Sequence, residues 1–308
     1  LPNFADGYNN LGLCYQKLER YQEAIAAFNQ AIRHKPGEYD YYENLGDTYL
    51  ITGNPQQAEH YYQNVLQYNS TNIGVYLKLG KLYRKQDKFL EAAETFKKVL
   101  AIDSTNAEAH YKLGVAYFDL TDYDASTASL EKTLQLKPRQ PKAHFFLGLI
   151  AARKNQFQTA VSHFNHSLAL APEDAETQYQ LGLAYSKINQ QKEAISAFQQ
   201  AVQLEPNHLA AHHNLAKVLL QAGKTDEGKM EMEIFQQLSQ QEQDIKKLQR
   251  TIPDDPKNPR LYKQLGEIYF QRGEYRNALG QFQKAIDLNP GDGETQKKLY
   301  ETLQLIKN

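Results

Sequence analysis

The chain has 308 residues, a formal net charge of -1 and a single cysteine. The near-neutral charge argues against a nucleic-acid-binding protein, because such proteins usually carry a basic excess. One cysteine excludes an internal disulfide, and no apolar run approaches the ~20 residues that a membrane-spanning helix needs. We therefore expect no nucleic-acid partner and no direct membrane span.

A short pattern, Y-x-x-L-G-x-x-Y, recurs along the chain. It first runs from Tyr8 to Tyr15, and its central glycine then returns at intervals of 34 residues. The glycines are Gly12, Gly46, Gly80, Gly114, Gly148 and Gly182; Ala216 continues the interval, and Gly266 follows 50 residues later. A fixed period of this length indicates stacked supersecondary repeats, each packing mainly on its neighbours.

Each repeat carries a second set of regularly spaced residues. An alanine such as Ala24 follows the glycine by 12 residues, and an aromatic residue such as Phe28 comes four residues later. A proline such as Pro36 closes most repeats, because proline cannot continue a helix. Both sets have helical spacing, so each repeat is predicted to form two helices, A and B. We expect the glycine and alanine to be small because two helix backbones approach closely there.

These correlated positions resemble the tetratricopeptide repeat (TPR), whose pattern is W-x2-L-G-x2-Y…A-x3-F…P. The resemblance implies an all-α fold, a right-handed superhelical solenoid of antiparallel helix pairs, here with a C-terminal capping helix. It also implies a concave groove lined chiefly by the A helices, in which proteins of this family bind other proteins. No cofactor is implied, and the chain is expected to be non-catalytic.

The repeats divide the chain into eight copies and two further segments. Seven repeats span 5-242, the eighth spans 259-292, and 293-308 is predicted to form the capping helix through Leu299, Leu303 and Ile306. Helix B of the seventh repeat is expected to run on to Gln249 or Arg250, so that 243-258 is a helical extension followed by a proline-rich loop. The first seven repeats are 5-38, 39-72, 73-106, 107-140, 141-174, 175-208 and 209-242.

The sequence contains no recognisable catalytic constellation. It lacks the G-x-S-x-G, Walker and dinucleotide-binding glycine patterns. The pairs His163/His166 and His208/His212 can each share a helical face, but neither has a cysteine partner or an obvious third ligand. We therefore predict no metal site and no enzyme activity. Cys14 is expected to be buried near the packing seam.

The A helices of the third to sixth repeats carry a distinctive set of side chains at their expected groove positions. We predict that the aromatic residues hold an apolar segment of a partner and that the cationic residues bind acidic side chains or a terminal carboxylate. The predicted partner-binding residues are Lys78, Lys81, Tyr111, Lys112, Phe118, Phe145, Phe146, Arg153 and Tyr179. The alternative is that the aromatics pack between neighbouring A helices and that Asp47 and Lys81 only form an ion pair between repeats.

These patterns favour a protein-interaction scaffold that binds a partner peptide or helix in its groove. A second interpretation is the TPR targeting arm of a larger enzyme or of a secretion or assembly complex. A third is self-association through residues 234-252, where Ile234, Leu238, Ile245 and Leu248 form a short coiled-coil-like seam. The sequence does not distinguish a cytoplasmic from a periplasmic location.

Overall fold

The computed structural model describes residues 3–307, and these residues form helices and no strands. The chain divides into two compact units, the first ending at Ala171 and the second beginning at Pro172. The prediction of an all-α array of helix pairs is confirmed. The first unit contains α1 (Asn3–Lys17), α2 (Tyr21–His34), α3 (Tyr39–Ile51), α4 (Pro55–Tyr68), α5 (Ile73–Lys85), α6 (Phe89–Ile102), α7 (Ala107–Asp119), α8 (Tyr123–Leu136), α9 (Pro141–Arg153) and α10 (Phe157–Leu170).

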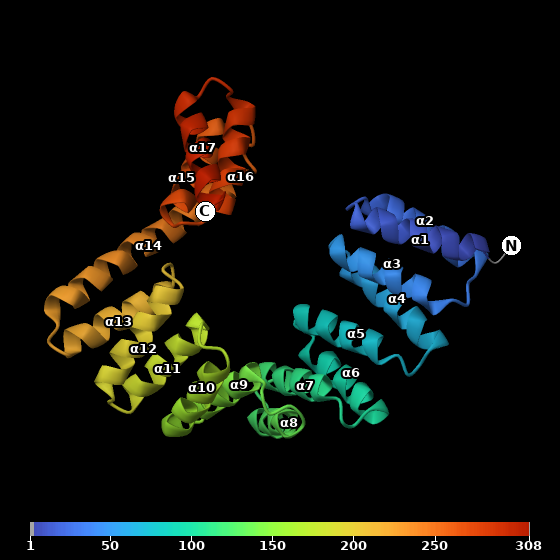
Figure 1. The fold of residues 1–308 in the computed structure, drawn as a ribbon, viewed down its shortest axis with the longest axis horizontal. Coiled ribbons are helices and arrows are strands. Elements are labelled where there is room, and N and C mark those ends of the chain that lie inside the picture. Colours follow the sequence, from blue (N-terminus) through green and yellow to red (C-terminus); the bar gives the residue numbers. More distant parts are fainter. Residues whose placement is uncertain (1–2, 308) are drawn as a thin grey trace. The chain divides into compact units, whose positions relative to one another are not determined.

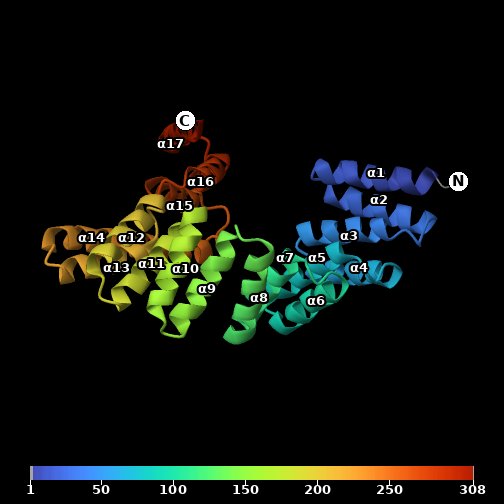
Figure 2. The same ribbon diagram turned by 60° about the horizontal axis from the view of Figure 1, so that its bottom comes forward.

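Within the first unit, each helix packs against the next one along the chain, and the A helices α7 and α9 also contact each other. The pairs from α1–α2 to α9–α10 follow one another in chain order in both views (Figures 1 and 2). This stacking is what brings side chains from successive A helices side by side.

An aromatic ring of helix B lies against the glycine of helix A. A Cβ atom added at Gly12 would lie 2.5 Å from a ring carbon of Phe28, a side chain with 0% exposure. A Cβ atom at Gly148 would meet the ring of Phe164 at the same distance. At these two positions the glycine is therefore small because a ring packs on it. At Gly114 the contact is with Leu130, whose side chain would lie 2.7 Å and whose backbone N 3.3 Å from an added Cβ, so the expected close approach of two backbones is seen there. A larger residue would overpack this contact at a cost of ~1–3 kcal/mol.

Every turn between helices A and B places one residue in the left-handed region of backbone space. The φ angles are 59° at Glu19, 76° at Gly53, 58° at Asp87, 61° at Thr121, 59° at Asn155, 59° at Asn189, 76° at Gly223 and 72° at Gly273. The amide after this residue closes the turn, as when Arg20 N donates to Tyr15 O over 2.9 Å. Glycine and asparagine adopt this conformation readily, whereas the β-branched Thr121 is strained by it.

Cys14, on the outer side of α1, was expected to be buried but is exposed. The equivalent position in later A helices is buried, as at Thr48 and Leu82 with 0% and 2% exposure. In those repeats the preceding helices pack on helix A, as α2 does on α3 and α4 on α5, but no described helix packs on the outer side of α1. Leu11 shows the same effect, being 42% exposed where Leu45 is fully buried.

The second unit contains one helix much longer than the others. Its helices are α11 (Ala175–Lys187), α12 (Gln191–Leu204), α13 (Leu209–Gln221), α14 (Thr225–Thr251), α15 (Pro259–Gln271), α16 (Tyr275–Leu288) and α17 (Gly293–Lys307). The predicted run-on of helix B is seen in α14, which has 27 residues, and Figure 1 shows it leading from α13 to the α15–α17 group.

The C-terminal half of α14 packs on α15, so the coiled-coil-like seam makes its contacts within the chain. Ile245 and Leu248 form a core cluster with Leu265 of α15. Gln241 Nε2 donates to Gln271 Oε1 over 3.2 Å, so even the polar position of the seam has a partner on α15. The seam proposed for self-association is thus largely buried within the chain.

The capping helix is present as α17, which packs against α16; Asn308, the last residue of the expected segment, lies outside the described residues. Two of the three residues predicted for its apolar face, Leu299 and Ile306, are half-buried, whereas Leu303 is 38% exposed. The fully buried positions of this face are Thr295 and Thr302, which the prediction did not include. The hydroxyls of both threonines have local acceptors, Asp292 and the carbonyl of Lys298, so burying them leaves no unpaired polar group.

Candidate functional site

Four of the predicted aromatic residues meet on neighbouring A helices of the first unit. Phe146 of α9 contacts Tyr111 and Phe118 of α7, with ring centroids 6.3 and 5.2 Å apart, and it contacts Phe145 at 5.6 Å. The contacts of Phe146 with Tyr111 and Phe118 join α9 to α7, and the contact with Phe145 lies within α9. All three are edge-to-face arrangements, which aromatic rings prefer. We call Tyr111, Phe118, Phe145 and Phe146 the aromatic cluster.

The aromatic cluster is half-buried. Beneath it, Leu130, Leu147 and Ile150 form a core cluster against which Tyr111, Phe118 and Phe146 pack. Burial raises the pKa of the Tyr111 hydroxyl, although the nearby charge of Arg84 acts in the opposite direction. Part of the Tyr111, Phe118 and Phe146 rings therefore supports the stacking of α7 on α9, as the alternative interpretation expected, whereas Phe145 also contacts Phe164 of α10. The remaining part of each ring is available at the surface.

Lys78 of α5 is already engaged by two carboxylates of α3. Its Nζ lies 2.8 Å from Glu43 Oε1 and 2.7 Å from Asp47 Oδ2, and the hydroxyl of Tyr62 donates to Asp47 Oδ1 over 2.6 Å. Burial by itself would lower the pKa of Lys78, but the hydrogen bonds to Asp47 and Glu43 raise it above its ordinary value. We call this group, Lys78 with Glu43, Asp47 and Tyr62, the lysine bridge.

The lysine bridge replaces the ion pair that the sequence suggested between Asp47 and Lys81. Lys81 and Arg153 are exposed and make no ion pair among the described residues. Lys112 has only a partner one turn away on α7, Glu108, whose carboxylate lies 3.3 Å from Lys112 Nζ. The three remaining predicted cations are therefore either free or weakly paired, since exposed pairs of this kind contribute little.

Tyr179 lies on α11 of the second unit. Its ring lies 4.7 Å from that of His208 and 5.9 Å from that of Phe198, and its hydroxyl accepts a hydrogen bond from Asn214 over 3.4 Å. Burial raises the pKa of its hydroxyl. It is a half-buried packing residue of the α11–α13 stack.

Sequence reasoning missed two features beside the aromatic cluster. Arg84 of α5 pairs with Asp119 at the end of α7, and the ring of Tyr123 lies 5.9 Å from that of Phe118. Arg84 and Asp119 are 35 residues apart, one repeat plus one position, so a comparison of adjacent positions in successive repeats could have found this pair. Tyr123 comes from helix B, which the groove analysis did not consider.

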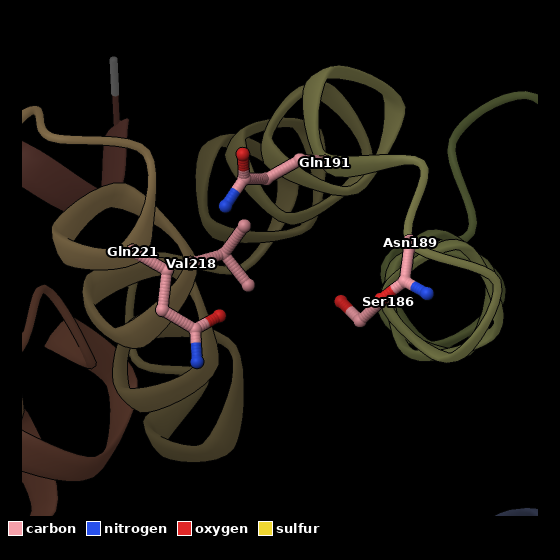
Figure 3. Close-up of a pocket in the computed structure, with 5 residues that line it drawn as sticks. All are labelled: Ser186, Asn189, Gln191, Val218 and Gln221. Atoms are coloured by element: carbon pink, nitrogen blue, oxygen red, sulfur yellow. The ribbon is translucent and has the colours of Figure 1, made fainter.

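Two of the hollows in the described part of the second unit are large enough to consider. One, of about 220 Å³, lies between the α11–α12 turn and α13, and Figure 3 shows Val218 and Gln221 opposite Ser186. Its lining side chains are neutral, the others being Asn189 and Gln191. The other hollow, of about 500 Å³, lies between α14 and α15 on an apolar base of Leu248, Leu261 and Ile268.

The described residues contain no group of three or more His, Cys, Asp or Glu side chains arranged to hold a metal ion. Within the same residues, no helix combines the length and the hydropathy that crossing a membrane would require.

Comparisons with known proteins point to one family. The model described as the Cilia and flagella-associated protein 70 C-terminal domain matches residues 37–252, and the tetratricopeptide repeat model matches residues 5–38 and 259–292. No curated protein sequence matches the chain.

Several solved structures are similar to the chain. A structure of the MamA protein is 28% identical, with a TM-score of 0.51 over 55% of this chain and 92% of that one. A tetratricopeptide repeat protein from Parabacteroides merdae has a TM-score of 0.58 and 15% identity over 98% of this chain and 99% of that one. YrrB, described as a TPR protein with an unusual peptide-binding site, is 23% identical, with a TM-score of 0.51 over 61% of this chain and 96% of its own. The last two show a shared fold.

Proposed function

The chain belongs to the tetratricopeptide repeat family, through the family of the Cilia and flagella-associated protein 70 C-terminal domain, and from this premise we propose that it is a non-catalytic protein-interaction scaffold. Its partner would be a peptide or helix held in a groove on the A helices of the first unit. The aromatic cluster would bind apolar side chains of that partner, because aromatic residues dominate the binding energy of protein interfaces.

One observation supports this proposal above the others. Four residues selected from the sequence for their groove positions form one cluster of ring contacts across α7 and α9. Two exposed cations without ion-pair partners, Lys81 on α5 and Arg153 on α9, lie on A helices of the same stack. An apolar segment that also carries acidic side chains or a terminal carboxylate would satisfy both groups. Lys78 is the weakest predicted contact, because binding a partner would require it to leave the lysine bridge.

The similarity to YrrB supports the scaffold more generally, because a solved YrrB structure is described as having a peptide-binding site. The second interpretation, a TPR arm of a larger enzyme or assembly, stays a prediction. The two interpretations agree on the nature of the site and differ only in what else is attached to it.

A displayed library of random peptides, selected against the intact chain, tests the proposal without a known partner. For the strongest selected peptide, Phe145→Ala is expected to weaken binding by about tenfold or more, as truncating an interface anchor does. Lys81→Glu is expected to weaken it less and to reduce its salt dependence. Binding would be measured by calorimetry, and helicity by circular dichroism.

Tyr68→Ala is the matched control, because Tyr68 is an exposed aromatic residue of α4, 52% exposed, outside the aromatic cluster. It should leave binding unchanged. Equal binding by the Phe145→Ala variant and the parent chain, at equal helicity, would rule out the aromatic cluster as the site.

A further inference from the structure

Three histidines of the α9–α10 pair lie in contact. His144 Nδ1 is 3.4 Å from His163 Nδ1, and the rings of His144 and His166 are stacked with centroids 5.2 Å apart. His144 comes from α9, and the other two come from α10. We call these three residues the imidazole cluster. The scaffold proposed above makes no use of them.

The position of His144 in its repeat has a recurring contact elsewhere in the chain. In four other repeats this position bonds the loop before helix A, as when Tyr42 OH donates to Pro36 O over 2.8 Å or when His110 Nε2 bonds Ser104 O. In the sixth repeat Gln178 bonds Gln200 of helix B instead. Among the described residues His144 makes no such bond, and its ring is directed to His163 instead. In the α9–α10 pair a contact between two titratable rings therefore stands in place of the bond to the loop.

The charge state of the cluster decides whether its contacts are favourable. With all rings neutral, one Nδ1 can donate to the other, and a first proton can be shared between His144 and His163 because an imidazolium donates to a neutral ring. A second proton on this pair leaves two N–H groups facing each other at 3.4 Å. A proton on His166 adds a like charge stacked against His144. Its own Nδ1 is fixed as a donor to the carbonyl of Ser162, at 2.7 Å.

The surroundings offer little compensation for this charge. Burial lowers the pKa of His144 and of His163, and the neighbouring rings lower both further. The opposing charge is Glu131 of α8, an exposed carboxylate that partly raises the pKa of His163. Neither α7 nor the loop before α9 places a charge that acts on either ring, among the described residues.

We propose that the imidazole cluster is a pH-sensitive joint, which holds α9 against α10 while its rings are neutral and loosens when two or more of them are protonated. Because Phe145 and Phe146 directly follow His144 on α9, loosening would also disorder the aromatic cluster and weaken partner binding in acid. That second consequence rests on the proposed function, whereas the joint itself does not.

The direction of the effect follows from proton linkage. In the folded state the pKa values of His144 and His163 are lowered from the ordinary histidine pKa of 6.5. Just below pH 6.5 the opened state therefore binds more protons than the folded state. Stability is therefore unaffected well above that value and falls as the pH decreases through it.

Amide hydrogen exchange of the intact chain at about pH 7.5 and about pH 5.5, corrected for intrinsic rates, measures this joint directly. Protection of α9 and α10 is expected to fall relative to α5 and α6, by at most about tenfold per pH unit for each extra proton taken up on opening. The α5–α6 pair is the internal reference because residues 73–106 contain no histidine. An equal change in both pairs would overturn the proposal.

Two variants make the test specific. His144→Tyr restores the residue found at Tyr42 and Tyr262 and should remove most of the excess acid sensitivity. His110→Tyr, the same change at the same repeat position but outside the cluster, should leave it intact. If His144→Tyr prevents folding, His163→Gln supplies the same test. An unchanged acid response in the folded variant would refute the joint.

Binding of the selected library peptide at the same two pH values then tests the consequence for the site. Affinity should fall in acid for the parent chain and fall less for His144→Tyr. Failure to select any peptide would count against the proposed function alone, because the exchange experiment needs no partner. If protection of α9 and α10 falls in acid as expected but peptide affinity does not change with pH, the joint stands and its proposed effect on partner binding is refuted.

Discussion

The α3–α6 region and the α7–α10 region share one frame but use their A-helix surfaces differently. In the first, the lysine bridge ties α3 to α5 with charges, and the ring that α4 packs on Gly46 is Tyr62, whose hydroxyl belongs to that network. In the second, the surface joining α7 to α9 is aromatic, and the ring that α10 packs on Gly148 is Phe164, which has no hydroxyl. Side chains at equivalent repeat positions can therefore either pair with a neighbouring repeat or remain partly exposed at the surface. Which of the two happens depends on whether the neighbouring repeat offers a partner.

Exchanging the two rings is the largest expected perturbation of this difference. Phe164→Tyr would place a hydroxyl opposite Leu149, which occupies the repeat position of Asp47 and offers no side-chain acceptor. Because Phe164 is fully buried, we expect a loss of ~1–3 kcal/mol of stability, the cost of an unsatisfied buried polar group. Thermal unfolding followed by circular dichroism measures it.

The reverse change, Tyr62→Phe, serves as the control. It removes one hydrogen bond while Asp47 keeps Lys78 as a partner, so the expected loss is about 1 kcal/mol or less. If Phe164→Tyr were tolerated as well as Tyr62→Phe, the α9–α10 pair would have to contain an acceptor for the hydroxyl, and the contrast between the two regions would disappear.

A smaller effect is expected from removing one cation in each region. Lys78→Met leaves Glu43 and Asp47 facing each other without a counter-charge and should cost about 1 kcal/mol, an effect that shrinks at high salt. Lys112→Met should cost less than ~0.5 kcal/mol, because its partner Glu108 is exposed and one turn away. Denaturant unfolding at low and high salt compares them, and equal losses would show that the lysine bridge has no special role.

The repeat frame could be predicted from the sequence because it depends on local and periodic constraints. Glycines every 34 residues mark the ring contacts, and the break at Pro253 and Pro256 marks the end of the extended α14. Lys78 shows where this reasoning stops. Its two acidic partners lie on the preceding A helix, and whether it turns toward them or toward a ligand depends on side-chain conformation, which periodicity does not specify.

Two other differences have the same physical origin. Cys14 and Leu11 occupy buried positions of the pattern, but burial requires a neighbouring helix, and none of the described helices covers that side of α1. Leu248 and Ile245 have the spacing of an intermolecular seam, but α15 reaches them within the chain. A hydrophobic stripe identifies a surface that will be covered without identifying what covers it.

A further predicted effect concerns the turns, where the two regions differ in sequence at one shared backbone conformation. The α3–α4 turn places Gly53 at φ 76°, and the α7–α8 turn places Thr121 at φ 61°. Both residues are exposed, so a substitution at either acts mainly through the backbone. Thr121→Gly removes the strain of a left-handed conformation at a β-branched residue, but glycine also has more conformational entropy in the unfolded chain. The net result is an expected gain in stability of about 0.5 kcal/mol.

Gly53→Thr is the matched reverse substitution and should lose about 1 kcal/mol, since no atom would contact the new Cβ and the backbone conformation alone would oppose it. Thermal midpoints of the two variants and the parent chain provide the measurement. Because the rings of Phe118 and Tyr123 meet across the Thr121 turn, 5.9 Å apart, the gain should also appear as slower amide exchange at the end of α7. A destabilised Thr121→Gly variant would mean that the threonine contributes an interaction to this turn and that the strain is already compensated there.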